Sequence, residues 1–227
     1  MKITTKGKFC AALRRHPCGW LLAAQLLAVC LYPFMEDSGA GRTISVIFGN
    51  GVLALALWVV NRNPTVNWVG WILALPAAGL SIAAYLGGSE SLMVVAHLLE
   101  SAVYFYAAVG LIFYMLADHR VTLDEFLAAG ATFTLLAWAY AFAFSVCQYF
   151  SPGSFTAAQN PASPRTWMEL LFLSFSTLSS VGLSDVAPVK PGARALIMLE
   201  MFSGVMYIAL VVSRLIALAS LRVKAEK

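Results

Sequence analysis

Charged side chains are scarce in this sequence. Lysine, arginine, aspartate and glutamate make up only 11% of the 227 residues, whereas hydrophobic residues make up 60%. Soluble globular domains carry about 25% charged residues, so the composition excludes that class and predicts an integral membrane protein in contact with lipid. The net charge of +4 lies mostly in short loops and near the two ends of the sequence, where basic residues set membrane orientation, and we expect no nucleic-acid partner.

Histidine is also scarce, which limits the catalytic sites that the chain could form. The chain has three histidines, which are far apart in the sequence: His16, His97 and His119. A membrane enzyme needs a cluster of nucleophilic, acid-base or metal-binding side chains, and no such cluster is visible. We therefore expect no enzymatic activity and no cofactor. A transporter would need an interrupted span in each of two related halves, but the chain has one interrupted region and no internal repeat.

The four cysteines form no CxxC pair and lie in or beside apolar segments: Cys10, Cys18, Cys30 and Cys147. Such cysteines are expected to behave as small buried hydrophobes. Their spacing therefore predicts neither a disulfide framework nor a metal site.

Long apolar runs dominate what is present. A helix needs roughly 20 residues to cross a hydrocarbon core of about 30 Å. Six runs meet this requirement and predict transmembrane helices near 18–35, 43–61, 67–86, 91–117, 124–150 and 193–221. The basic start of the sequence is followed by no small-residue cleavage site, so we expect the first run to be retained as a helix and not removed as a signal peptide.

Basic residues predict the orientation of these runs. They gather before the first run, between the second and third, between the fourth and fifth, and after the sixth: Lys2, Lys6, Lys8, Arg14, Arg15, Arg62, Arg120, Arg222, Lys224 and Lys227. The positive-inside rule then places both termini in the cytoplasm, and we expect a bacterial inner membrane. Arg165, Lys190 and Arg194 lie on the opposite side and are local exceptions.

Residues 166–186, TWMELLFLSFSTLSSVGLSDV, are too short and too polar to span the membrane. An amphipathic run, Trp167 to Thr177, precedes an extended tail that includes Gly182. Non-helical backbone at membrane depth is tolerated where protein buries it or where it lines a water-filled cavity. The segment therefore predicts a re-entrant loop whose carbonyl groups face a pore and bind cations.

The segment FSFSTLSSVGLSD resembles the filter of the tetrameric potassium channels, which reads Thr-Val-Gly-Tyr-Gly-Asp, and the small bacterial two-helix pore domains in particular. The likeness covers residues 124–222. It implies an all-α membrane protein with six transmembrane helices, a re-entrant pore helix and filter between the last two, and a homotetrameric pore. Residues 118–227 would be the pore domain. Residues 1–117 would be a peripheral four-helix bundle, at the position of a voltage sensor in six-span channels.

The resemblance also implies the ion-binding residues. Carbonyl groups of Ser180, Val181, Gly182 and Leu183, with the Ser180 hydroxyl, would bind a potassium ion, or sodium in its place, and Ser184 and Asp185 would complete the outer filter. The side chains expected to support this filter are Phe172, Leu173, Ser176 and Thr177.

Two positions depart from the family pattern. Leu183 stands in the place of the tyrosine, so its support becomes van der Waals packing on Leu173. Ser184 stands in the place of the second glycine, where a left-handed backbone costs a non-glycine residue on the order of 1 kcal/mol. We expect a looser outermost site. Potassium-selective conduction is favoured, and a weakly selective cation pore or a non-conducting regulatory or scaffold protein stays open.

The last apolar run carries Gly204 midway, where the family's inner helix has its gating glycine. Two interpretations of this glycine remain: a hinge in the helix, or a close contact with another helix. Val205, Ile208 and Val212 would line an apolar cavity and gate that closes by dewetting. Glu200, on the same run, is expected to bond to the back of the pore helix.

The fourth run, 91–117, contains no arginine or lysine at three-residue spacing, so we expect weak or no voltage sensing. It does contain His97 and Glu100, which share one helical face. They are candidates for a proton sensor or a metal-binding pair, and packing through hydrogen bonds to each other or to a neighbouring helix is the alternative.

Local signals predict where helices begin. Thr122 with Glu125 fits a capping box, and Glu169 lies in the first turn of the pore helix, where a negative charge is favourable. The loop at 151–165 has three prolines and is expected to lack regular structure.

Overall fold

The computed structural model describes residues 16–35, 39–60, 67–117, 122–217 and 220. Helices form most of this part of the chain: α2 (Pro17–Met35), α3 (Gly39–Val60), α4 (Asn67–Gly87), α5 (Glu90–Ala117), α6 (Leu123–Phe150), α7 (Trp167–Leu178) and α8 (Pro191–Tyr207). A five-residue π-helix, η1 (Ile208–Val212), continues α8. Two short strands, β1 (Phe155–Ala157) and β2 (Val186–Pro188), flank α7 in the sequence.

A helix occupies each of the six predicted apolar runs. Within the described residues, four helices are long and apolar enough to cross a membrane: Trp68–Gly87, Glu90–Ala117, Leu123–Phe150 and Pro191–Ala217. Two further apolar helices, Pro17–Tyr32 and Phe48–Val60, are shorter over their described residues. The protein is therefore an all-α membrane protein, and a count of six crossings stays a prediction. The basic residues behind the orientation argument, with Cys10 and His119, lie outside the described residues.

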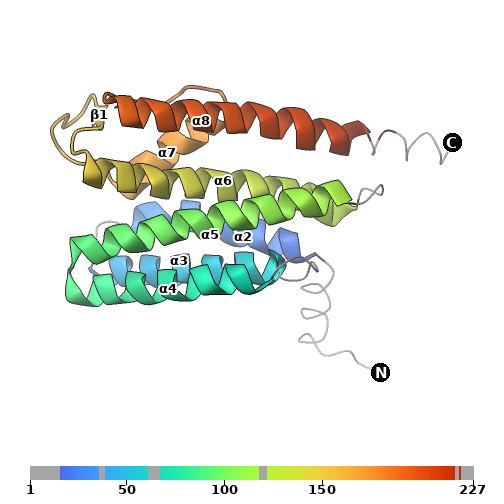
Figure 1. The fold of residues 1–227 in the computed structure, drawn as a ribbon, viewed down its shortest axis with the longest axis horizontal. Coiled ribbons are helices and arrows are strands. Elements are labelled where there is room, and N and C mark those ends of the chain that lie inside the picture. The colour runs from blue at the N-terminus through green and yellow to red at the C-terminus, as the bar shows by residue number, and fades with distance from the viewer. Residues whose placement is uncertain (1–15, 36–38, 61–66, 118–121, 218–219, 221–227) are drawn as a thin grey trace.

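The long helices lie side by side along one direction, with α6 at the centre (Figure 1). Helix α6 packs most extensively on α5, and it also contacts α2, α7 and α8. Helices α3 and α4 lie on the far side of α5, away from α8 (Figure 1). Polar groups of α6 pair with its neighbours: Thr134 donates to Gln25 of α2 over 2.6 Å, and Ser101 of α5 donates to the Ala139 carbonyl over 2.9 Å.

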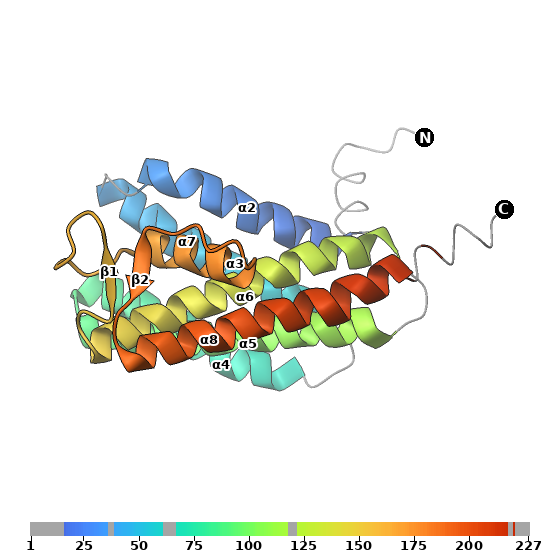
Figure 2. The same ribbon diagram turned by 90° about the horizontal axis from the view of Figure 1, so that it is seen from above.

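Short helix α7 lies in the half of the molecule that carries β1 and β2 (Figure 2). It contacts α6 on one side and α8 on another. Its observed bounds differ by one residue from the predicted Trp167–Thr177. Because α7 is followed by non-helical backbone, its position determines where residues 179–185 lie.

Both predicted helix starts are present. Thr122 caps α6 in a capping box, in which Glu125 N donates to Thr122 Oγ1 over 3.3 Å and Thr122 N donates to Glu125 Oε2 over 3.1 Å. Thr166 caps α7 in the same way with Glu169. Each box satisfies amide groups that the first turn of a helix leaves unpaired.

The expectation that residues 151–165 lack regular structure is wrong in part. Strand β1 pairs antiparallel with β2, with Thr156 opposite Ala187. Each strand has only three residues, which is too short to show an alternating pattern in the sequence. The pair attaches the loop before α7 to the segment after it.

Candidate functional site

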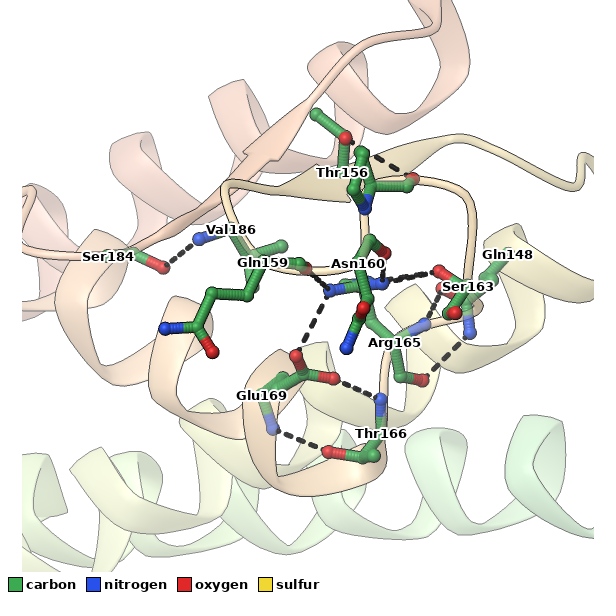
Figure 3. Close-up of polar contacts among 11 residues, drawn as sticks. Gln148, Thr156, Gln159, Asn160, Ser163, Arg165, Thr166, Glu169, Ser184 and Val186 are labelled. Carbon is green, nitrogen blue, oxygen red and sulfur yellow. Dashed lines mark hydrogen bonds and ion pairs between the residues drawn. The ribbon is translucent and has the colours of Figure 1, made fainter.

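Arg165 organises the entrance to α7 (Figure 3). Its side chain is buried, with 6% of the residue exposed, and its guanidinium donates to the carbonyl oxygens of Gln159, Asn160 and Ser163. It also forms an ion pair with Glu169 in the first turn of α7, at 3.1 Å. The fork of five N–H donors suits such a convergent set of acceptors.

Gln148, near the end of α6, holds the Arg165 backbone from the other side. Its Oε1 accepts from Arg165 N over 2.8 Å, and its Nε2 donates to Arg165 O over 3.0 Å (Figure 3). The charge of Arg165 thus binds carbonyl groups of the loop, which gives a physical reason for a cation at a position that the predicted orientation places outside the cytoplasm. The sequence contains no local signal for this role, because the acceptors are main-chain carbonyls of a loop.

The segment after the predicted filter is attached to the same loop. Val189 N donates to the Ser154 carbonyl over 2.8 Å, and Lys190 Nζ donates to the Pro152 carbonyl over 2.7 Å. Arg194 Nε donates to the Pro188 carbonyl over 3.4 Å. Lys190 and Arg194, the other two exceptions to the charge rule, therefore also bond to loop carbonyls.

At the end of α7 the backbone leaves the helix, and φ alternates in sign along residues 180–183. Ser180 and Gly182 have φ values of 61° and 70°, whereas Val181 and Leu183 do not have positive φ. Val181 N and Gly182 N both donate to the Ser176 carbonyl, each over 3.1 Å. Two amides thus bind a carbonyl in the last turn of α7, and residues 181–183 follow as non-helical backbone attached to that turn.

These predicted ion-binding residues are exposed in the single chain. Val181 is 69% and Leu183 is 71% exposed, and Ser180, Gly182 and Asp185 are also exposed. A Cβ added at Gly182 would meet no atom within 4 Å, so glycine is needed there for its φ and not for space.

Ser184 differs from the expectation. It is not in the left-handed region, since the described non-glycine residues with positive φ are Asn160 and Ser180. Its Oγ instead accepts from Val186 N over 3.1 Å, which starts the turn into β2. The strain predicted at Ser184 is therefore wrong, and the non-glycine residue with left-handed backbone in this segment is Ser180.

The predicted support residues lie on α7 as the helical spacing requires. Leu173, Ser176 and Thr177 are buried, and Phe172 is exposed. Ser176 Oγ has no hydrogen-bond partner among the described residues. Because Leu173 is buried and Leu183 is exposed, packing of Leu183 in a cuff would require another chain and stays a prediction.

Gly204 lets α8 approach α7 closely. A Cβ added there would lie 2.9 Å from the Leu178 carbonyl carbon and would overlap its oxygen. The interpretation of Gly204 as a close helix contact thus has a structural basis, and its role as a hinge is untested.

Of the residues predicted to line the cavity and gate, Val205 and Ile208 are exposed and Val212 is half-buried. The π-helix η1 begins at Ile208. Glu200 is fully buried and bonds to Ser174 of α7, which confirms the expected bond to the helix that was predicted as the pore helix.

His97 and Glu100 turn to different neighbours. The His97 ring packs on Phe142 of α6, with ring centroids 5.2 Å apart. The buried Glu100 carboxyl bonds to Ser81 of α4. In the described part of the chain no group of three or more metal-ligating side chains is present. These contacts favour the packing alternative for the pair.

Arg214 is a residue that the sequence analysis missed. Its guanidinium donates to the Leu116 carbonyl over 2.7 Å, at the C-terminal end of α5. A cation is favourable there because the last carbonyls of a helix carry partial negative charge. The signal that could have indicated this role was a basic residue within the otherwise apolar last run. Arg214 joins the last helix to the helix that precedes the predicted pore domain.

The match to a protein family agrees with this geometry. A sequence model described as an ion channel domain matches residues 93–220, which is more than half of the chain and includes α5 to α8. The chain belongs to this ion channel family. No curated protein and no solved structure matches it. The protein is thus a membrane protein of an ion channel family, and this family is one of channels and not of enzymes.

Proposed function

We propose that the channel conducts monovalent cations, potassium above sodium, through a filter built from the carbonyl groups of residues 180–183. The observation that carries the proposal is the alternating sign of φ along residues 180–183, with positive φ at Ser180 and Gly182, in exposed backbone at the end of α7. Alternation turns successive carbonyl groups toward one line, where they can replace an ion's hydration shell. The C-terminal end of α7 adds a partial negative charge that favours a cation.

The pore in this proposal is a homotetramer. One segment of four residues cannot enclose an ion, so several copies must meet around an axis. Each copy would contribute a re-entrant α7 and filter between the last two of six crossings. Both termini would lie in the cytoplasm of a bacterial cell, with residues 118–227 forming the pore and residues 1–117 lying outside it.

The proposal is tested by ion flux in liposomes. Purified channel should carry potassium down its gradient, and a reversal potential under opposed potassium and sodium should show preference for potassium. Gly182→Ala should lower potassium flux at least fivefold, because alanine in the left-handed region costs about 1 kcal/mol or more in each of four chains. Gly192→Ala is the matched control, since nothing lies within 4 Å of a Cβ there and its φ is not positive.

A weakly selective cation pore is the second candidate, and one observation favours it. Ser184 is held in the turn into β2 by its bond to Val186 N, so the alternation of the backbone ends before it. The row of carbonyl sites would then be shorter at its outer end. A reversal potential near zero under opposed potassium and sodium, which means equal permeability to the two ions, would select this candidate. Absence of flux from a folded tetramer would select a regulatory or scaffold role.

A further inference from the structure

One hydroxyl group joins three helices behind the filter. Ser174 of α7 is fully buried, and its Oγ lies 2.8 Å from the Ala137 carbonyl oxygen of α6. The same Oγ bonds to Glu200 Oε1 of α8. Ser176, whose carbonyl holds the amides of Val181 and Gly182, is two residues further along α7. The hydroxyl therefore sets the position of the helix to which the filter segment is attached.

Counting hydrogens assigns the proton in this cluster. A serine hydroxyl has one hydrogen to donate, and a main-chain carbonyl oxygen can only accept. Ser174 Oγ lies within hydrogen-bond distance of two oxygens, Ala137 O and Glu200 Oε1, and its one hydrogen can serve only one of them. A proton on Glu200 lets Glu200 donate to Ser174 while Ser174 donates to Ala137, so the geometry favours the neutral carboxylic acid.

The surroundings of Glu200 suit the neutral form. Glu200 is 0% exposed, and its Oε2 has no hydrogen-bond partner among the described residues. Tyr140 of α6 is the titratable side chain that faces it, and the Tyr140 hydroxyl bonds to Ser203 over 2.7 Å. Across the described helices no cation forms an ion pair with Glu200. A carboxylate in this place would have neither solvent nor a counter-charge, which is highly unfavourable.

We propose that Glu200 is a proton-carrying positioning residue, whose proton holds α7 against both α6 and α8. If Glu200 lost this proton, its carboxylate would take the Ser174 hydrogen in a charge-assisted bond, and the Ala137 carbonyl would lose its bond to Ser174. Helix α7 would then keep its polar bond to α8 and lose this polar bond to α6. The consequence for conduction rests on the proposed filter, whereas the position of the proton does not.

Infrared spectroscopy of the full-length protein tests the proton directly. At neutral pH the protein should show the carbonyl stretch of a protonated carboxylic acid, and Glu200→Gln should remove that component. Ser174→Ala should keep the component and shift it to the frequency of a more weakly hydrogen-bonded acid. Glu100→Gln is the control, because Glu100 is a buried carboxyl on another helix and should contribute separately. An unchanged spectrum in Glu200→Gln would overturn the assignment.

Flux in liposomes tests the role of the proton. Wild-type flux should fall as pH is raised well above neutral on both sides of the membrane, whereas flux through Glu200→Gln should stay within about twofold over the same range, because the amide can still donate to Ser174. The same alkaline fall in both proteins would overturn the proposed role. If no variant conducts, the filter proposal fails, and the infrared result still decides whether Glu200 carries the proton.

Discussion

At the scale of single residues, the loop before α7 and the segment after it are held by a few polar side chains that bind main-chain groups. Arg165 binds three loop carbonyls and Glu169, and Ser184 accepts from Val186 N. Buried or half-buried contacts of this kind matter because a buried polar group without a partner costs about 1–3 kcal/mol. The loop and the filter segment are therefore fixed to one another by bonds that depend on individual side chains.

Ser184→Gly should raise the preference for potassium over sodium. Glycine removes the hydroxyl that binds Val186 N and makes the left-handed backbone available at about 1 kcal/mol lower cost, which is roughly a fivefold change in population. The outer carbonyl could then join the alternating series. The measurement is the reversal potential under opposed potassium and sodium. Ser163→Gly, at an exposed loop serine, is the control, and an unchanged permeability ratio in Ser184→Gly would contradict the prediction.

Residues whose partners lie nearby in the sequence could be predicted, and those with distant partners could not. The capping box of Thr122 with Glu125 follows from a four-residue pattern and is present. The sequence did not predict the role of Arg165 and showed only a charge that is an exception to the positive-inside rule. Its contacts in the loop are to main-chain carbonyls, which every sequence contains. Ser184 was assigned a strained backbone by analogy with a glycine, whereas a local hydroxyl bond gives it another conformation.

At the scale of elements, α7 is a short helix whose place depends on its neighbours. It spans 12 residues, which is too few for a stable isolated helix, so tertiary contacts must stabilise it. Its start is fixed by the Thr166 cap, its middle by Ser174, and its end by the close approach of Gly204 on α8. Movement of α8 at Gly204 would therefore be transmitted directly to the end of α7.

Gly204→Ala should destabilise the channel and reduce its conduction. The added methyl group would overlap the Leu178 backbone, and such overpacking costs about 1–3 kcal/mol. Thermal unfolding in detergent and flux in liposomes measure the two effects. Gly192→Ala on the same helix has free space at its Cβ and should unfold at the wild-type temperature. If Gly204→Ala changed gating without lowering the unfolding temperature, the hinge reading would hold and the contact reading would not.

The long helices could be predicted from hydropathy, and α7 was predicted to within one residue. A long helix is predicted from the mean hydropathy of many residues, so a few polar residues within it do not change the prediction. The β1–β2 pair and the π-helix η1 were not predicted. Three residues cannot display a strand period, and a π-helix has the same apolar composition as the α-helix that it interrupts.

At the scale of the whole molecule, the helices divide into a well-packed centre and an exposed last helix. Helix α6 contacts α2, α5, α7 and α8, whereas α8 contacts α6 and α7 and, through η1, α5. One face of the last helix is therefore left without a partner in the single chain. Its exposed large apolar side chains are Met198, Leu199, Met201, Phe202, Val205, Met206, Ile208, Leu210 and Ile216.

Either lipid or another copy of the chain could cover such a face, and the proposed pore requires copies to meet there. Phe172, Val181 and Leu183, at and after α7, are exposed as well. Helix α7 packs on α8, and the proposed filter must lie near the axis of the proposed assembly, so we expect copies to meet on this side. Helix α4 also exposes large apolar residues, including Leu75 and Leu86, but it lies on the far side of α5 from α8 (Figure 1).

Phe202→Ala should weaken the tetramer, whereas Leu75→Ala should not. The two side chains are equally exposed in the single chain, at 64% and 66%, so exposure alone predicts the same effect for both. If the last helix faces other copies and α4 faces lipid, truncating Phe202 should cost about 2 kcal/mol per interface. Native mass spectrometry in detergent, over a dilution series, measures the fraction of tetramer. Equal dissociation of both variants, or a wild-type protein that stays monomeric, would contradict this arrangement of the four chains.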